Sequence, residues 1–289
     1  MVRKLSSVLV VALAFFLLGY ALGVRSMPLT LSIGSGPIAL VQAGTVTETL
    51  QLPPGSTGPL AGTLPVASTA GTTLLATLSG TIGSIGLTAT FPPGWVQVAA
   101  NSTTDRVEAW IYPNNPGGIS SIAVQVLSNP SLTLTYYIAV SEWANVYLIA
   151  ATIDTSGIAS ATSGTTLALA TTGNVAATGE VAIAAWLQAA TPSGAVIFTT
   201  PGGWTRLADN GSDAASNVHV DSEYQPNPSS GSPLSVTLTS NRTTLGAGGV
   251  LLVLKPAPLA TDQTSMLQYG TVTIKGNTAD FSLIDPADG

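Results

Sequence analysis

The residues of this chain that could carry acid–base chemistry are few. His219 is the only histidine, and it lies between two valines in the stretch 217–221. A Ser-His-Asp triad would have to use this histidine, yet the chain has no Gly-x-Ser-x-Gly elbow to present a serine nucleophile. We therefore interpret His219 as a histidine on the solvated face of a strand.

Paired carboxylates are a second candidate, because glycoside hydrolysis needs two acids within about 5–10 Å of each other. The best candidates are Glu108, Glu142, Asp221 and Glu223. Glu108 and Glu223 fall at matching places in two similar stretches, which suggests one such acid in each. The sequence does not show that any two of them share a cleft. We expect these acids on polar strand faces and predict no catalytic residue.

A short acidic turn could hold a cation. Asp209, Asn210 and Asp213 surround Gly211, and calcium loops use oxygen ligands at alternate positions around a glycine. The ligand series of an EF-hand and its terminal glutamate are missing, and Asn and Asp also favour ordinary turns. The three residues are weak metal candidates, and we predict no metal and no cofactor.

The tryptophans could bind sugars, because an exposed aromatic ring on a β-sandwich can stack on a sugar ring. Trp95 and Trp204 each follow a Pro-Gly or Gly-Gly turn and precede an apolar strand, which predicts that both are buried. Trp110, Trp143 and Trp186 are not repeated as tryptophan elsewhere. We take Trp110 and Trp143 as the candidates for glycan stacking.

The stretch of sequence that contains several of these residues occurs twice. Phe91–Val98 reads FPPGWVQV and Thr200–Leu207 reads TPGGWTRL, and the similarity continues from Val107–Tyr112 to Val220–Tyr224. Each copy then passes a turn rich in Pro, Gly and Asn and enters an alternating apolar run. This period is longer than the roughly 20–50 residues of a solenoid repeat. It predicts a duplicated domain.

Strand signals dominate both copies. Val, Ile, Thr, Tyr and Trp fill the candidate strands, and clusters of Gly, Pro, Asn and Ser separate them. The predicted fold class is all-β, with two tandem antiparallel β-sandwich domains, an N-terminal hydrophobic helix and a C-terminal β-hairpin. We place a β lead-in segment at 26–60, the sandwiches at 61–153 and 158–257, and the hairpin tail at 258–289. Within the tail, the strands 269–275 and 278–283 flank a Gly-Asn turn of the type that closes hairpins.

Residues 1–25 have the features of an export signal. Arg3 and Lys4 precede an uncharged run from Leu5 to Val24 that ends in small residues. The run is also long enough to cross a bilayer at about 1.5 Å per residue. We expect either a cleaved signal peptide or a retained membrane or assembly helix. Both alternatives place the remaining chain outside the cytoplasm.

Composition narrows the class of partner. Charged residues make up 8% of the chain, against about 25% in typical proteins, and the net charge is −6. So few cations cannot neutralise a phosphate backbone, which argues against a nucleic-acid partner. The chain has no cysteine, which excludes disulfides and thiol chemistry. A surface poor in ions favours the close packing of identical subunits, because self-repulsion is weak.

The repeated tryptophan turn belongs to a longer pattern in each copy: an acidic loop, an aromatic strand and an apolar last strand follow it. This pattern resembles the tandem immunoglobulin-like or jelly-roll-like sandwiches of phage tail and virion proteins and of bacterial surface proteins. The resemblance covers about residues 61–257. It implies an extracellular, cell-surface or virion location and a structural or adhesive role, and it carries over no catalytic residue.

We therefore expect a non-enzymatic structural subunit of a filament, sheath or particle that assembles into homo-oligomers. The strands within 29–52 and the C-terminal hairpin are suited to exchange between subunits. The alternative is an adhesion module that binds a glycan or a host surface.

Overall fold

The computed structural model describes residues 31–32, 36–48, 52–81, 88–101, 105–127, 135–146, 152–189, 193–214, 216–257, 263–267, 270–275 and 278–283. These residues form strands and turns and include no helix, which confirms the predicted all-β class. The hydrophobic helix expected within 1–25 lies outside the described residues. In the part of the chain that is described, no helix is long and apolar enough to span a membrane.

The chain divides into two compact units. The body consists of residues 36–257, and the terminal unit combines 1–35 with 258–289. In the terminal unit, β1 (Leu31–Ser32) pairs with β21 (Thr278–Leu283), which pairs with β20 (Gly270–Lys275) and through it with β19 (Gln263–Leu267). The antiparallel pairing of β20 with β21 confirms the predicted C-terminal hairpin. The strands β1 and β19 extend this hairpin into a four-stranded sheet.

The body contains four sheets that fall into two equivalent halves. In the first half, the large sheet has the order β2-β10-β5-β8-β7, with β3 also pairing with β10, and the small sheet has the order β4-β9-β6. In the second half, the large sheet has the order β11-β18-β13-β16-β15 and the small sheet the order β12-β17-β14. The two orders correspond strand for strand. The predicted tandem of β-sandwiches is therefore confirmed.

The strand bounds show where each sandwich begins. The first consists of β2 (Ala39–Ala43), β3 (Thr47–Glu48), β4 (Thr57–Thr63), β5 (Thr73–Thr81), β6 (Thr88–Thr90), β7 (Val96–Ala100), β8 (Asp105–Tyr112), β9 (Ser121–Leu127) and β10 (Tyr136–Ala144). The second consists of β11 (Ile153–Ala161), β12 (Gly164–Asn174), β13 (Val181–Ala189), β14 (Phe198–Thr199), β15 (Thr205–Asp209), β16 (Val218–Pro226), β17 (Pro233–Thr244) and β18 (Gly246–Leu254). Both sandwiches thus begin earlier than the sequence indicated, because β2 pairs with β10 and β11 pairs with β18.

The strand order is that of a jelly roll. If the main strands of each half are numbered one to eight in chain order, leaving β3 aside, the large sheet reads 1-8-3-6-5 and the small sheet 2-7-4. An eight-stranded jelly roll pairs its first strand with its last in the same way. The fifth strand here joins the large sheet beside the sixth.

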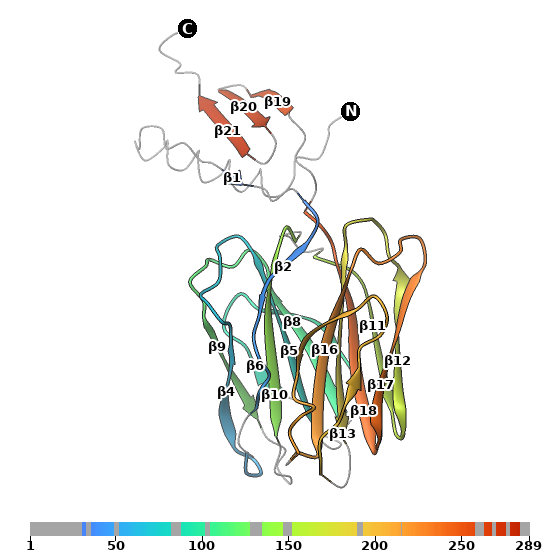
Figure 1. Ribbon diagram of the computed structural model, residues 1–289. Coiled ribbons are helices and arrows are strands. Elements are labelled where there is room, and N and C mark those ends of the chain that lie inside the picture. Colours follow the sequence, from blue (N-terminus) through green and yellow to red (C-terminus); the bar gives the residue numbers. More distant parts are fainter. Residues whose placement is uncertain are drawn as a thin grey trace. The chain divides into compact units, whose positions relative to one another are not determined.

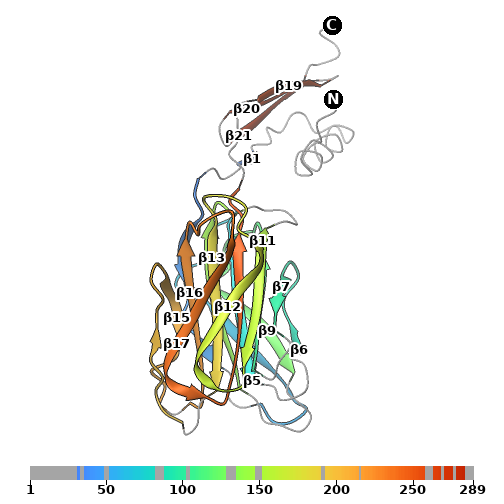
Figure 2. The same cartoon turned by 90° about the vertical axis from the view of Figure 1, so that its right-hand side faces the viewer.

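Three hydrophobic cores separate the four layers of the body. Each sandwich has a core between its large and small sheets, and a third core lies between the two large sheets. The layers run from β4 and β9 on the left of Figure 1 to β12 and β17 on the right. Figure 2 shows the sheet of β12 and β17 from its outer side. Because both faces of a large sheet are covered, β18 is buried at every position.

A glycine-rich strand start lets the two sandwiches approach closely. A Cβ atom on Gly248 of β18 would overlap the carbonyl oxygen of Asp105, and one on Gly246 would overlap the Asp105 carboxylate. The start of β8 in the first sandwich therefore packs directly on the backbone of the second. Elsewhere between the large sheets, small cavities of about 10 Å³ each have room for a single water.

Candidate functional site

One face of β16 directs a row of polar side chains into the second sandwich. Val218 and Val220 belong to the core between the two large sheets, which we call the central core. The alternate residues His219, Asp221 and Glu223 therefore point to the opposite face of the sheet. All three are buried, with exposed fractions of 0, 1 and 0%. The interpretation of His219 as solvated, and of these acids as lying on polar faces, is therefore wrong. In a four-layer body, the second face of a large sheet meets another core instead of solvent.

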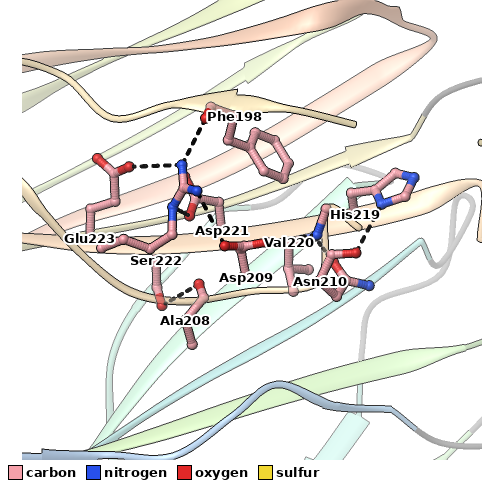
Figure 3. A network of polar contacts seen from close by, with 11 residues as sticks. Phe198, Ala208, Asp209, Asn210, His219, Val220, Asp221, Ser222 and Glu223 are labelled. Atoms are coloured by element: carbon pink, nitrogen blue, oxygen red, sulfur yellow. Dashed lines mark hydrogen bonds and ion pairs between the residues drawn. The ribbon is translucent and has the colours of Figure 1, made fainter. Parts of the chain in front are cut away.

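Arg206 of β15 lies against this row and compensates its charge. Its Nε atom is 3.1 Å from Asp221 Oδ1, its Nη1 atom 3.3 Å from Asp209 Oδ2, and its Nη2 atom 3.6 Å from Glu223 Oε1. The same Nη2 atom donates a hydrogen bond of 2.8 Å to the carbonyl oxygen of Phe198. Figure 3 shows these acids beside the strand β14 residue Phe198. One arginine thus ties β14, β15 and β16 together.

The cluster holds more acid than base, and this perturbs its titration. Burial and the adjacent Glu223 raise the pKa of Asp221 to about 8, although Arg206 opposes the shift. Burial also raises the pKa of Glu223, while a hydrogen bond with the Thr200 side chain and the charge of Arg206 lower it. Because two close carboxyl groups inside a protein do not both ionise readily, the pair holds a proton at neutral pH.

His219 lies farther along the row and does not join the ion pairs. Its Nδ1 atom is 3.4 Å from the carbonyl oxygen of Asn210, and its Nε2 atom has no hydrogen-bond partner among the described residues. No serine hydroxyl contacts either ring nitrogen in that part of the chain, so the described residues assemble no Ser-His-Asp triad.

In the first sandwich, the positions that correspond to this ionic cluster include an aromatic residue. A β-bulge falls after Gln97 in β7 and after Arg206 in β15, which makes these two residues equivalent. The same registers make Glu108 the counterpart of Asp221 and Trp110 the counterpart of Glu223. The sequence-based match of Glu108 with Glu223 is therefore wrong, because the loop before β16 is longer than the loop before β8.

Trp110 fills the position that Glu223 holds in the second copy. Its ring stacks on Phe91 with centroids 4.4 Å apart, and its Nε1 atom donates to Glu108 at 2.9 Å. The other oxygen of Glu108 pairs with Arg106 at 2.8 Å. The scaffold thus accepts either an aromatic stack or an ionic cluster at this place.

Glu142, the remaining acid candidate, is fully buried on β10 far from the acidic row in the sequence. Its carboxylate accepts hydrogen bonds from the Thr69 amide at 2.7 Å, the Thr72 hydroxyl at 2.8 Å and the Gln42 side chain at 2.5 Å. These donors come from β2 and from the loop before β5. Glu142 therefore cross-links three segments of the first sandwich.

Hydrogen bonds to backbone amides stabilise the acidic turn of residues 209–213. Asp209 accepts from the Gly211 amide at 2.9 Å, and Asn210 accepts from the Val220 amide at 2.6 Å. Asn101 accepts from the Val107 amide in the same way in the first sandwich. No group of three or more acids, histidines or cysteines that could hold a metal occurs in the described residues. Asp213 adds a backbone bond to Asn210, so the turn resembles an Asx turn more than a metal loop.

The tryptophans divide into core residues and one accessible ring. Trp95 and Trp204 are each 9% exposed, in line with the prediction that both are buried. Trp143 and Trp186 are fully buried, which leaves no ring face of Trp143 for a sugar. Trp110 is half-buried with one face on Phe91, so of the two proposed stacking residues it alone stays accessible.

The sequence analysis did not identify Arg206 as the charge partner of Asp221 and Glu223. Arg206 follows directly on the repeated tryptophan turn, and the whole chain has only eight lysines and arginines. A cation inside a strand of such a chain was a usable signal that a buried acid lies nearby. No family model, curated protein or solved structure matches this chain.

Proposed function

We propose that the protein is a non-enzymatic structural subunit of an extracellular or virion surface assembly, and that its chain ends join neighbouring subunits. The observation that carries the proposal is the terminal unit. Segments from opposite ends of the chain form one sheet in a unit of their own, and among the described residues the outer strands of that sheet, β1 and β19, each pair on one side only.

Within the described residues, the outer strands of this sheet leave backbone groups without a strand partner. β21 pairs with β1 only through Ala279 and Thr278, and β19 pairs on one side only among the described residues. A free edge accepts a strand from another chain through main-chain hydrogen bonds. A second copy of this chain is the simplest donor, because each copy brings both a short strand and an open edge.

The distribution of charged residues in the body also supports a structural function. Asp221, Glu223 and Glu142 are buried and engaged in contacts that tie strands together, as the ion pairs and hydrogen bonds above indicate. With 8% charged residues in the chain, few ions remain for the surface. Identical bodies of this kind pack closely with little electrostatic repulsion.

The test is the mass of the particles in solution. The full chain and a chain ending at Ala257 are compared by sedimentation velocity over a range of concentrations. We expect oligomers or filaments from the full chain and monomers from the shortened chain, with the same β-rich circular dichroism spectrum. Monomers of the full chain at every concentration would contradict the proposal.

A glycan-binding function is the second candidate, and the accessible ring of Trp110 is the observation that favours it. Binding on a glycan array that disappears in Trp110→Ala, while assembly is retained, would support this alternative. The buried Trp204→Phe serves as the control for effects on folding.

A further inference from the structure

One loop of the second sandwich brings together the groups that the self-modification of an asparagine requires. Asn210 is followed by Gly211, and this is the only Asn-Gly pair among all 289 residues. The pair lies between β15 and β16, beside the row of His219, Asp221 and Glu223 (Figure 3). In such a pair the backbone nitrogen of glycine can attack the side-chain amide carbon of asparagine, because glycine has no side chain to block the approach.

The nucleophile of this reaction is in contact with a base. The Gly211 amide donates a hydrogen bond of 2.9 Å to Asp209 Oδ1. The other carboxylate oxygen of Asp209 lies 3.3 Å from Nη1 of Arg206, which helps to fix the carboxylate in place. Gly211 is held as well, since its carbonyl oxygen accepts a hydrogen bond of 2.7 Å from the Val196 amide. A base within hydrogen-bond reach can take the amide proton while the nitrogen forms its new bond.

The side-chain amide of Asn210 is polarised by a backbone donor. Its Oδ1 atom accepts a hydrogen bond of 2.6 Å from the Val220 amide of β16. A donor at this oxygen stabilises the negative charge that develops there when the carbon is attacked, as an oxyanion hole does. The Nδ2 atom makes a longer hydrogen bond of 3.4 Å with the Val218 carbonyl oxygen, so the leaving group is held less tightly than the oxygen.

The first sandwich has the same asparagine without the rest of the site. Asn101 is the counterpart of Asn210, since each accepts a hydrogen bond of 2.6 Å from the amide of a valine in the following strand. Alanine precedes Asn101 and serine follows it, so this copy has no acid at the position of Asp209 and no glycine at the position of Gly211. The asparagine therefore belongs to the shared scaffold, whereas the base and the glycine are specific to the second sandwich.

We propose that Asn210 and Gly211 react with each other in the folded protein and close a succinimide ring. The Gly211 nitrogen forms a bond to Cγ of Asn210 and passes its proton to Asp209. The bond between this carbon and the side-chain nitrogen of Asn210 then breaks. That nitrogen leaves as ammonia, with its own two hydrogens and the proton carried by Asp209, and no oxidation state changes.

Water then opens the ring at either of its two carbonyl carbons. One opening gives aspartate at position 210, and the other gives isoaspartate, in which the main chain runs through the former side chain. Each product replaces a neutral amide by a carboxylate next to Asp209, whose ion-pair partner Arg206 already serves two buried acids. The reaction thus adds negative charge to a cluster that already holds more acid than base.

The test compares the rate of this reaction in the folded full chain with its rate in the same chain unfolded in guanidinium chloride, at one pH and temperature. Trypsin releases residues 207–242 as one peptide, and a sample taken at the start gives the background from digestion. Electron-transfer fragmentation locates the exchange of NH₂ for OH at Asn210 and separates isoaspartate from aspartate. We expect the folded chain to react faster, by about tenfold or more, because folding brings the base and the amide donor to the reacting groups. A folded chain that reacts no faster than the unfolded chain would overturn the proposal.

One variant and one internal control assign the roles. Asp209→Asn keeps an oxygen that accepts from the Gly211 amide but removes the base. We expect the rate in the folded variant to fall by about tenfold or more, with an unchanged circular dichroism spectrum. An undiminished rate would show that Asp209 is not the base. Asn101 should stay unmodified in the same samples, and modification of Asn101 at the rate of Asn210 would contradict the roles of Asp209 and Gly211.

Discussion

At the scale of single residues, burial decides what each charge does. Asp221 and Glu223 lie two positions apart on one strand, so both side chains enter the same interior beside a single arginine. The first sandwich fills this space with Phe91 and Trp110. Carboxyl groups in such a place hold their protons to higher pH than they do in the unfolded chain.

The first prediction concerns pH. The pKa of Asp221 rises from 3.8 to about 8, so the folded chain binds its proton more tightly than the unfolded chain. The free energy of unfolding therefore falls as the pH rises between these values, by at most about 1.4 kcal/mol for each pH unit. Asp221→Asn, which stays neutral, should melt at a higher temperature than wild type at about pH 8. A lower melting temperature for Asp221→Asn at this pH would contradict the proton assignment.

The second prediction concerns Glu142. Glu142→Gln replaces one acceptor oxygen by an NH₂ group that faces other donors, while the site stays fully buried. We expect a loss of about 1–3 kcal/mol in the free energy of unfolding by urea titration. The exposed Glu48→Gln should change it by less than about 0.5 kcal/mol. Equal effects of both variants would show that the buried hydrogen bonds do not stabilise the fold.

At the scale of elements, both copies of the duplicated domain have glycines at equivalent positions of the backbone. Both copies of the tryptophan turn place a glycine at positive φ, Gly94 at 96° and Gly203 at 83°. Gly44 directly follows the first strand β2, and Gly157 lies within the first strand β11. At both glycines a Cβ atom would overlap a carbonyl oxygen of the facing strand, β4 or β12. These glycines let the first strand pass close to the small sheet.

The third prediction tests that close approach. Gly157→Ala should lower the free energy of unfolding by about 1–3 kcal/mol or more, because the added methyl group meets the carbonyl of Ala170. Gly202→Ala is the matched control, since nothing lies within 4 Å of its Cβ position. Similar melting temperatures for the two variants would contradict the close packing of β11 on β12.

The elements themselves could be predicted well from the sequence. Strand propensity, the repeated turn and the Gly-Asn hairpin indicate the all-β fold, and their period indicates two copies. The layering could not be predicted, because the sequence does not show that two large sheets share a core. For that reason His219 and the acids of β16 seemed to face solvent. The bulge that brings Arg206 to Asp221 also leaves no local signal.

At the scale of the whole molecule, the central core makes the two sandwiches interdependent. Trp143 packs edge-on against Tyr224 with centroids 5.4 Å apart, and Tyr137 and Ser216 share a hydrogen bond of 3.1 Å. Neither large sheet could lose its partner without exposing an apolar face. The body should therefore act as one cooperative unit.

The fourth prediction follows from this core. Calorimetry of the full chain should give a single transition for the body, with agreement between the calorimetric and van't Hoff enthalpies. Gly248→Leu should lower the temperature of that transition, because its side chain would collide with the Asp105 backbone across the interface. Two separate transitions in the wild-type protein would show that the sandwiches fold independently.

Electron cryo-microscopy of the assembled full chain tests whether the chain ends join neighbouring subunits. We predict density in which a strand of a neighbouring chain is added to the edge of β19 or β21 in the terminal unit. Assemblies whose subunits touch only through their bodies, with both edges free, would contradict it.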